Sequence, residues 1–287
     1  VLKDLGIKGL FQTIVTACAS GTDAIGIGAG WIENDICDVV IAGGADELNL
    51  IPFVGFIKLM VASSEPCKPF DKNRNGINLG EGAGIMILES EKFAQKRKAK
   101  QTGAILGYDS ACDGYHATRP HPDGRGLRKA IASLGTISRL SFINAHATAS
   151  IDNDMVEAKV FNDLFPNIPI SATKSLTGHT LGAAGAIEAC LTLISLNNGI
   201  IPKTKNFKTK DEKINLTPTT ENIKFDGSKT AISTSLSFGG CNSVLMIGGD
   251  CRHCGHDPQS PSTQCGRSTP EIAGQARNDG GSRGAKL

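Results

Sequence analysis

The alternation of short apolar runs with helical segments is the feature of this sequence that most restricts its fold. Residues 38–44 (DVVIAGG) and 85–89 (IMILE) are continuous apolar runs of the kind that form buried strands. Helical patterns lie between such runs, for example at 20–33 and 183–196. This alternation predicts an α/β fold in which helices cover a buried sheet. Further strands are expected at 104–107, 141–145, 168–172, 230–234 and 244–248, and further helices at 90–100, 126–134 and 154–164.

The end of the chain differs in composition from the rest. In the segment 251–287 the only large aliphatic residues are Ile272 and Leu287. Such a segment buries too little apolar surface to offset the entropy lost on ordering, so we expect a disordered tail. Some of its residues have spacings that partly resemble a zinc site, but no second pair completes a tetrahedral set, and no metal site is predicted. These residues are Cys251, Cys254, His256 and Cys265.

The charge balance gives no reason to expect a nucleic acid or an anionic membrane as a partner. The chain has 30 Lys and Arg against 28 Asp and Glu, a net charge of +2. No apolar run reaches the roughly 18 residues of a membrane helix, and the first eight residues do not resemble a signal peptide. The nine cysteines are spread through a chain that is 40% hydrophobic, which indicates reduced thiols and a cytoplasmic protein.

The segment 13–25 (TIVTACASGTDAI) is the strongest candidate for a catalytic element. A β-branched run leads into Cys18, and small residues and a helical pattern follow. This pattern predicts a strand-to-helix turn with the sulfur near a helix N-terminus, where unpaired amides favour a thiolate. A thiolate there is suited to forming a thioester. The segment is equally consistent with a small buried cysteine in a close-packed turn.

Two histidines have the positions expected of partners for such a thiol. His146 follows the expected strand at 141–145, and His179 precedes an apolar helix. In open α/β sheets, binding sites form beyond the carboxyl ends of strands, and both histidines fit that placement. Each alone is more often structural than catalytic, and spacing by itself does not prove that the three residues meet.

Several motifs together resemble the β-ketoacyl-acyl carrier protein synthases, in particular the elongating condensing enzymes. The likeness covers about residues 1–250. In chain order, the motifs are 16–21 (TACASG), 69–76 (PFDKNRNG), 79–84 (LGEGAG), 144–148 (NAHAT), 174–179 (KSLTGH) and 237–242 (SFGGCN).

The resemblance implies a thiolase-like α/β fold with αβαβα layers. Residues 1–100 would be the remainder of the N-terminal half, which contains the nucleophile, and 101–250 the C-terminal half. The first half is expected to be incomplete, because the family places a substantial half-domain before its cysteine and only 17 residues precede Cys18. Relatives are homodimers and use no metal or diffusible cofactor, and the glycine-rich segments 26–30 and 80–84 lack a full nucleotide-binding fingerprint.

The resemblance also implies a function, the decarboxylating Claisen condensation of fatty acid or polyketide-type synthesis. Cys18 would take an acyl chain from acyl carrier protein as a thioester. His146 and His179 would bind the malonyl thioester and stabilise the enolate formed when carbon dioxide leaves. The implied supporting residues are Lys174 and Glu188 beside the histidines, Phe238 with its amide at the oxyanion, and Thr118, Thr148 and Ser150 along the phosphopantetheine arm of the partner.

The sequence departs from the family pattern at Ala147, Ile151 and Cys241, where Gly, Pro and Thr are usual. Two alternatives therefore stay open. One is a thiolase-type acyltransferase, with Cys241 as a second catalytic cysteine, although the 174–179 motif fits decarboxylating enzymes better. The other is a truncated, inactive remnant of a condensing enzyme. The basic run 92–100 is either a solvated helix face or a docking surface for an acidic carrier protein.

Overall fold

The computed structural model describes residues 4–137 and 139–250. Over these ranges, none of the helices has the length and apolar character needed to cross a membrane. The expected disordered tail and its candidate zinc ligands, Cys251, Cys254, His256 and Cys265, lie outside the described residues.

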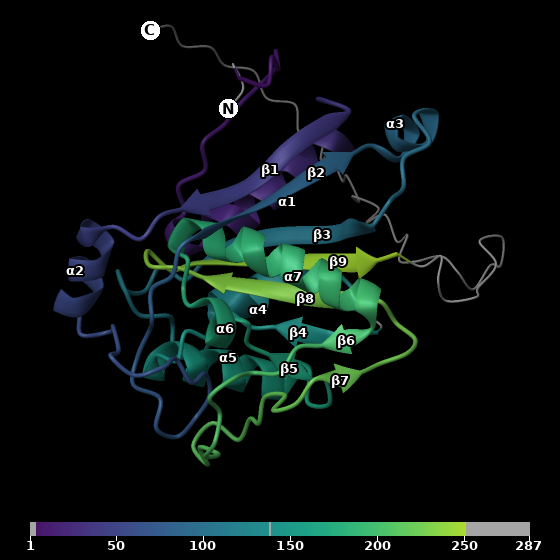
Figure 1. The fold of residues 1–287 in the computed structure, drawn as a ribbon. Helices are drawn as coiled ribbons and strands as arrows, with labels where there is room; N and C mark the ends of the chain where they lie inside the picture. Colours follow the sequence, from purple (N-terminus) through teal and green to yellow (C-terminus); the bar gives the residue numbers. More distant parts are fainter. Residues whose placement is uncertain (1–3, 138, 251–287) are drawn as a thin grey trace, which may run out of the picture. The chain divides into compact units, whose positions relative to one another are not determined.

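A mixed five-stranded sheet forms the centre of the fold (Figure 1), with strand order β3-β9-β8-β4-β5. Its antiparallel half pairs β9 with β3 on one side and β8 on the other, and its parallel half places β4 between β8 and β5. The strands are β3 (Gly103–Cys112), β4 (Phe142–Asn144), β5 (Ile170–Ser171), β8 (Thr230–Leu236) and β9 (Cys241–Gly249).

A second sheet has two antiparallel strands, β1 (Val39–Asp46) and β2 (Gly82–Glu89). Two helices, α1 (Ser20–Glu33) and α7 (Ala184–Asn198), pack against each other and contact both sheets, so they form the layer between them. Their close approach requires glycine: a Cβ on Gly21 of α1 would lie 2.6 Å from the backbone nitrogen of Ala186 in α7. This contact fixes the start of α1, where the candidate nucleophile lies.

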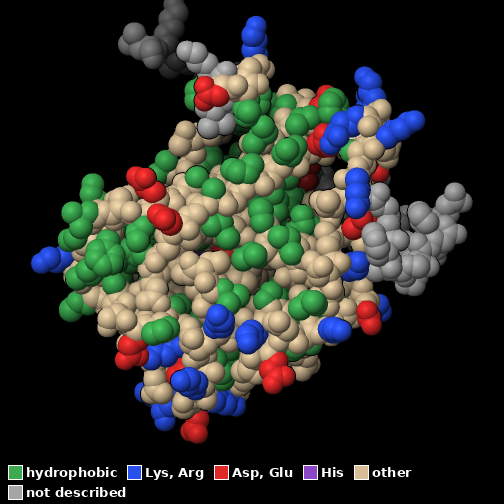
Figure 2. All heavy atoms as spheres, in the orientation of Figure 1, with side chains coloured by type: hydrophobic (Ala, Val, Ile, Leu, Met, Phe, Trp, Pro, Cys, Tyr) green, Lys and Arg blue, Asp and Glu red, His purple; other side chains and the backbone are tan. Residues whose placement is uncertain are grey.

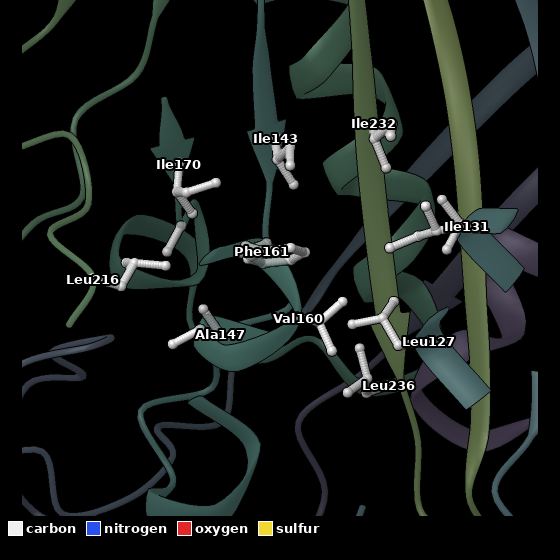
Figure 3. Close-up of a cluster of buried hydrophobic side chains, with 14 of the residues drawn as sticks. Leu127, Ile131, Ile143, Ala147, Val160, Phe161, Ile170, Leu216, Ile232 and Leu236 are labelled. Carbon is white, nitrogen blue, oxygen red and sulfur yellow. The ribbon is translucent and has the colours of Figure 1, made fainter. Parts of the chain in front are cut away.

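Helices α4 (Arg125–Ser133) and α5 (Ile151–Leu164) cover the other face of the five-stranded sheet. Figure 3 shows Leu127 of α4 and Phe161 of α5 beside Ile143 and Ile232 of the sheet. Neighbouring residues on the same strands, such as Ala231, point to the opposite face and pack against α1 and α7. Burial on both faces explains the apolar runs of this sheet. The runs at 38–44 and 85–89 instead form β1 and β2, where residues such as Ile41 are exposed (44%). The expected α/β alternation is confirmed.

Local expectations differ from the structure at three places. The β-branched run 13–16 forms no strand, and Val15 is 84% exposed, because no described strand lies beside it to accept its backbone hydrogen bonds. The helix expected at 90–100 is shorter, α3 (Glu91–Lys96). An additional helix, α2 (Leu50–Lys58), was not expected because it contains Pro52 and Gly55, which usually disfavour helix.

The remaining elements are short. They are the 3₁₀ turns η1 (Ala17–Ala19) and η2 (Leu181–Ala183), the helix α6 (Lys174–Thr177), and the paired strands β6 (Ile200–Ile201) and β7 (Ile223–Lys224). Two of these, η1 and α6, position candidate site residues.

Candidate active site

Cys18 is the middle residue of the η1 turn, which directly precedes α1, and its side chain is buried. The hydroxyl of Ser20 holds this turn by accepting a hydrogen bond from the Thr16 amide and donating one to the Ala17 carbonyl. Ala17 has φ 51°, a left-handed conformation that is strained for a residue with a Cβ. The sequence pattern therefore predicted the helix N-terminus correctly, although the residues before it form no strand.

His179 is in direct contact with Cys18. Its Nε2 lies 3.0 Å from Cys18 Sγ, and its backbone amide donates to the Asn78 carbonyl at 2.7 Å. The Nδ1 atom of His179 is buried and has no hydrogen-bond partner among the described residues. A proton on Nε2 therefore leaves no buried ring N–H unpaired, and we assign this neutral tautomer to His179.

His146 stands beside His179, with ring centroids 5.3 Å apart and planes at 89°. Lys174 Nζ lies 3.0 Å from Nδ1 of His146 and forms a 2.5 Å ion pair with Glu188 Oε1. All of these side chains are buried. Because an ammonium only donates hydrogen bonds, Nδ1 of His146 must accept, and the proton of the neutral ring is on Nε2.

The electrostatic environment keeps both imidazoles uncharged. Burial, followed by the positive charge of Lys174, holds the pKa of His146 and of His179 well below the usual range. Burial raises the pKa of Glu188 to about 7, opposed by the adjacent Lys174 ammonium. The site therefore presents two neutral imidazoles, each able to donate from Nε2.

Burial is also the largest influence on the nucleophile and raises the pKa of Cys18 to about 11. Lys174 lowers this pKa, and so do the backbone amides of Phe238 and of Cys18 itself, whereas Glu188 raises it. Two backbone N–H groups therefore stabilise a negative charge on the sulfur. The same pair of donors is suited to an oxyanion that develops on a thioester attached there.

A pocket of about 560 Å³ brings the candidate residues together. Cys18, His146, His179 and Phe238 line it, as do the proposed channel residues Thr118, Thr148 and Ser150. Lys174 and Glu188 are not part of this wall; they lie behind His146 and act on the pocket through it. The ring of Phe238 stacks on Phe56 of α2, with centroids 5.5 Å apart and planes at 17°.

Cys241 has a different position from that expected of a second catalytic cysteine. It does not line the pocket, and its sulfur contacts the hydroxyl of Ser110 at 3.2 Å. Its other close polar neighbours are Ser243 and the carboxylate of Asp23. This placement gives no support to the thiolase-type alternative.

Glu157 is a supporting residue that the sequence reasoning missed. Its buried carboxylate accepts hydrogen bonds from the amides of His146 (2.9 Å) and Ala147 (2.6 Å) and from the hydroxyl of Thr234 (2.8 Å). Ala147 has φ 28°, a value that the family's usual glycine would adopt without strain. Glu157 therefore fastens the strained turn that carries His146. The signal that could have identified it is an acidic residue in the first half of the helix that follows the candidate histidine.

Asp154 stabilises the next part of the same turn. Its carboxylate accepts from the amides of Phe70 (2.7 Å) and Ala149 (3.2 Å), and Arg74 lies 3.9 Å away. Burial raises the pKa of Asp154 to about 7.

Over the ranges that the structure describes, there is no cluster of three or more His, Cys, Asp or Glu suited to a metal ion.

Comparisons with known proteins find similar sequences over most of this chain. The family model described as "Beta-ketoacyl synthase, N-terminal domain" matches residues 2–94, and "Beta-ketoacyl synthase, C-terminal domain" matches residues 102–208. The chain is 37% identical over 260 residues to 3-oxoacyl-[acyl-carrier-protein] synthase 2 of Synechocystis, covering 85% of this chain and 62% of the relative. It is 36% identical to the chloroplastic synthase II of Arabidopsis thaliana, covering 85% of this chain and 48% of that relative.

Solved structures give the same result. The ishigamide ketosynthase/chain length factor matches with a TM-score of 0.82 at 33% identity, over 87% of this chain and 63% of that one. The ketosynthase ApeO in complex with its chain length factor from Xenorhabdus doucetiae matches with a TM-score of 0.79 at 35% identity, over 87% and 62%. The chain spans less than two thirds of the length of each of these relatives.

Proposed function

Because the chain belongs to the β-ketoacyl synthase family and has the family's thiolase-like α/β fold, we propose that it catalyses a decarboxylating Claisen condensation. The substrates are malonyl-acyl carrier protein and an acyl chain held as a thioester on Cys18, in fatty acid or polyketide-type synthesis. The observation that carries this proposal is the 3.0 Å contact between Cys18 Sγ and His179 Nε2, with His146 beside it in one pocket.

The first step transfers the acyl group to Cys18. The sulfur attacks the thioester carbonyl carbon of the acyl carrier, and the amides of Cys18 and Phe238 stabilise the resulting oxyanion. The intermediate collapses with cleavage of the bond to the carrier's sulfur, which leaves with the proton that Cys18 gives up. The Nε2–H of His179 donates to the Cys18 sulfur and so favours its anionic form during attack.

The second step forms the carbanion. The carbon–carbon bond to the malonyl carboxylate breaks, carbon dioxide leaves, and the electron pair delocalises onto the thioester oxygen as an enolate. The Nε2–H groups of His146 and His179 donate to this oxygen. Donation from neutral imidazoles requires no proton exchange with solvent, which suits a buried site.

The third step joins the two chains. The enolate carbon attacks the carbonyl of the Cys18 thioester, and the same two amides hold the oxyanion. Collapse of this intermediate breaks the bond to Cys18 Sγ and releases a β-ketoacyl group on the carrier, after which the thiolate takes up a proton. Lys174 and Glu188 are positioning residues, because they fix the tautomer of His146 without reaching the pocket.

Acyl carrier protein is the proposed partner, and its phosphopantetheine arm supplies the only prosthetic group. Thr118, Thr148 and Ser150 line the pocket that the arm would enter. One similar solved structure contains a type II polyketide acyl carrier protein in complex with its ketosynthase, which supports this partner. We further propose that the two halves of the family domain, 1–100 and 101–250, join near residue 100. The end of one family match at residue 94 and the start of the other at 102 support this junction.

A homodimer in the cytoplasm is the proposed state of the protein. Apolar side chains are exposed over α2, including Ile51 at 85%, and on the face of the β1–β2 sheet, including Ile87 at 67%. Figure 2 shows these hydrophobic side chains gathered over both regions of one face. Exposed apolar area of this kind is typical of an interface between subunits. The abundance of free thiols supports a reducing compartment.

Release of labelled carbon dioxide from malonyl-acyl carrier protein, in the presence of an acyl donor, tests the proposal. We expect release that depends on acylation and that disappears in Cys18→Ala, with a β-ketoacyl carrier as product. Turnover of acetyl-CoA without carbon dioxide release would instead indicate a thiolase-type reaction. A folded chain that is not acylated at Cys18 would indicate an inactive remnant.

A further inference from the structure

Cys112 and Cys241 face each other across two strands of the central sheet. Cys112 is the last residue of β3, Cys241 is the first residue of β9, and the two are direct register partners. Directly opposed residues of an antiparallel pair project from the same face of the sheet. Of the six described cysteines, all of them free thiols, no other two are register partners across strands.

The hydrogen-bond pattern defines the type of this pair. The next pair along, Asp113 and Gly240, is hydrogen-bonded, with Asp113 N–H donating to the Gly240 carbonyl at 2.8 Å. The carbonyl of Cys241 accepts instead from Ser237, on the side of β8. Because bonded and non-bonded pairs alternate along an antiparallel ladder, Cys112 and Cys241 form a non-hydrogen-bonded pair.

This geometry is compatible with a covalent bond between the two sulfurs. In non-hydrogen-bonded pairs the Cα atoms are about 4.5 Å apart, which lies inside the range spanned by disulfides. In the structure the sulfurs contact other groups: Cys112 Sγ is 3.6 Å from the Gly239 carbonyl, and Cys241 Sγ is 3.2 Å from the Ser110 hydroxyl. Rotation of the two side chains is therefore the movement that closure requires.

We propose that Cys112 and Cys241 are an oxidation site that closes to a reversible cross-strand disulfide. The oxidant is a disulfide such as oxidised glutathione. The Cys112 thiolate attacks one of its sulfurs and releases one glutathione thiolate. The Cys241 thiolate then attacks the Cys112 sulfur of the mixed disulfide and releases the second. Two thiols are oxidised, one disulfide is reduced, and the two protons pass to the two glutathione thiolates.

The exposure of the pair supports this order of events. Cys112 is exposed and so can be reached by a dissolved oxidant, whereas Cys241 is partly buried and is reached through Cys112. An accessible cross-link of this kind is also readily reduced, which makes the modification reversible in a reducing compartment.

The cross-link would act on the candidate active site, and this consequence rests on the proposed function. The loop 237–240 joins β8 to β9 and ends at Cys241. It carries Phe238, which stacks on Phe56 and whose amide faces the Cys18 sulfur. Tying the base of this loop to β3 restricts its movement, so the oxidised protein is expected to acylate Cys18 several-fold more slowly than the reduced protein.

Peptide mapping of the full chain in glutathione redox buffers tests the site. We expect a Cys112–Cys241 cross-linked peptide, about 2 Da lighter than the two reduced peptides together, that dithiothreitol removes. Cys112→Ser and Cys241→Ser should each abolish it. Cys190→Ser is the matched control, because Cys190 is partly buried like Cys241 but lies in α7 and has no strand partner. This variant should retain the cross-link.

Accumulation of the mixed glutathione disulfide on Cys112 without closure would overturn the proposal, as would preferential pairing of Cys112 with another cysteine. The second readout is the rate of Cys18 acylation in oxidised and in reduced protein. Cys112→Ser cannot form the cross-link, so any slowing on oxidation of this variant measures direct oxidation of Cys18. A cross-link that forms without slowing acylation would overturn the effect on the loop. Failure of both forms to acylate would count against the proposed condensing activity, while the peptide map still reports on the disulfide.

Discussion

Nζ of Lys174 lies 3.0 Å from Nδ1 of His146, and this contact determines which ring nitrogen carries the proton. The lysine is itself held by Glu188, so an ion pair buried behind the pocket determines which nitrogen of His146 can donate a hydrogen bond. Lys174 and Glu188 therefore stay outside the pocket, whereas the neutral imidazole of His146 lines it.

Removal of the lysine should affect decarboxylation more than acylation. In Lys174→Met, the donor to His146 Nδ1 is lost and Glu188 remains buried without its counter-ion. We expect carbon dioxide release to fall about 10²-fold or more, the scale of a lost transition-state donor, and the unfolding free energy to fall by about 3–5 kcal/mol. Single-turnover release and thermal unfolding measure the two effects.

The double variant Lys174→Met/Glu188→Leu distinguishes position from stability. It replaces the buried ion pair with apolar side chains, so most of the lost stability should return, whereas decarboxylation should stay low. Recovery of activity together with stability would mean that Lys174 contributes only to folding.

Replacement of Glu157 should release the turn that carries His146. The amide of His146 bonds to one oxygen of Glu157 and the amide of Ala147 to the other. In Glu157→Gln one of these oxygens becomes an NH₂ group, which cannot accept, so one of the two amides loses its partner. We expect a loss of about 1–3 kcal/mol in unfolding free energy and slower carbon dioxide release. Asp163→Asn, which removes an exposed ion pair with Arg128, is the control and should change stability by less than about 1 kcal/mol. Equal stability of the two variants would contradict the assignment.

The buried carboxyl of Asp154 should make stability depend on pH. Its pKa is raised from 3.8 to about 7 in the folded state, so the folded protein binds a proton that the unfolded chain has released. The resulting stabilisation is complete below the unfolded pKa and is lost as pH rises from about 4 to about 7. The slope of unfolding free energy against pH in this window should therefore become less negative or more positive in Asp154→Asn. If Asp154→Asn only removed a hydrogen bond, the curve of unfolding free energy against pH would shift as a whole and keep its slope. An unchanged slope would therefore refute the prediction.

The three motifs that contain Cys18, His146 and His179 could be singled out in the sequence because each is a short run of consecutive residues. The small residues after Cys18 allow the close contact between α1 and α7. The turns at His146 and His179 are each marked by a short motif, although distant residues also hold them: Glu157 accepts from the His146 amide and Asn78 from the His179 amide. Glu157 was missed because its role depends on tertiary contacts with the 146–147 turn. The pairing of Cys112 with Cys241 was missed because it depends on the order of β3 and β9 in the sheet, which hydrophobic patterning does not determine.

The α2 helix and the 13–16 segment show that local sequence propensity can also predict the wrong secondary structure. Pro52 and Gly55 disfavour helix locally, yet Pro52 lies in the first turn, where its missing amide hydrogen is tolerated. Val15 belongs to a β-branched run, but a strand needs a neighbour, and no described strand pairs with it. Intrinsic propensity decided neither case, because position within the element and the presence of a partner were decisive.

The reactivity of Cys18 should respond in opposite directions to changes in the two charged residues behind His146. Lys174 lowers the pKa of Cys18 and Glu188 raises it, while burial sets it at about 11. Alkylation by iodoacetamide, followed on the Cys18 peptide, should rise about tenfold per pH unit between about pH 7 and 10, because the thiolate is the reacting form. At a fixed pH, Lys174→Met should slow alkylation and Glu188→Gln should accelerate it. Lys159→Met, which removes an exposed pair with Asp123, should leave the rate unchanged. The same change of rate in both Lys174→Met and Glu188→Gln would show that access to the pocket, and not charge, controls the nucleophile.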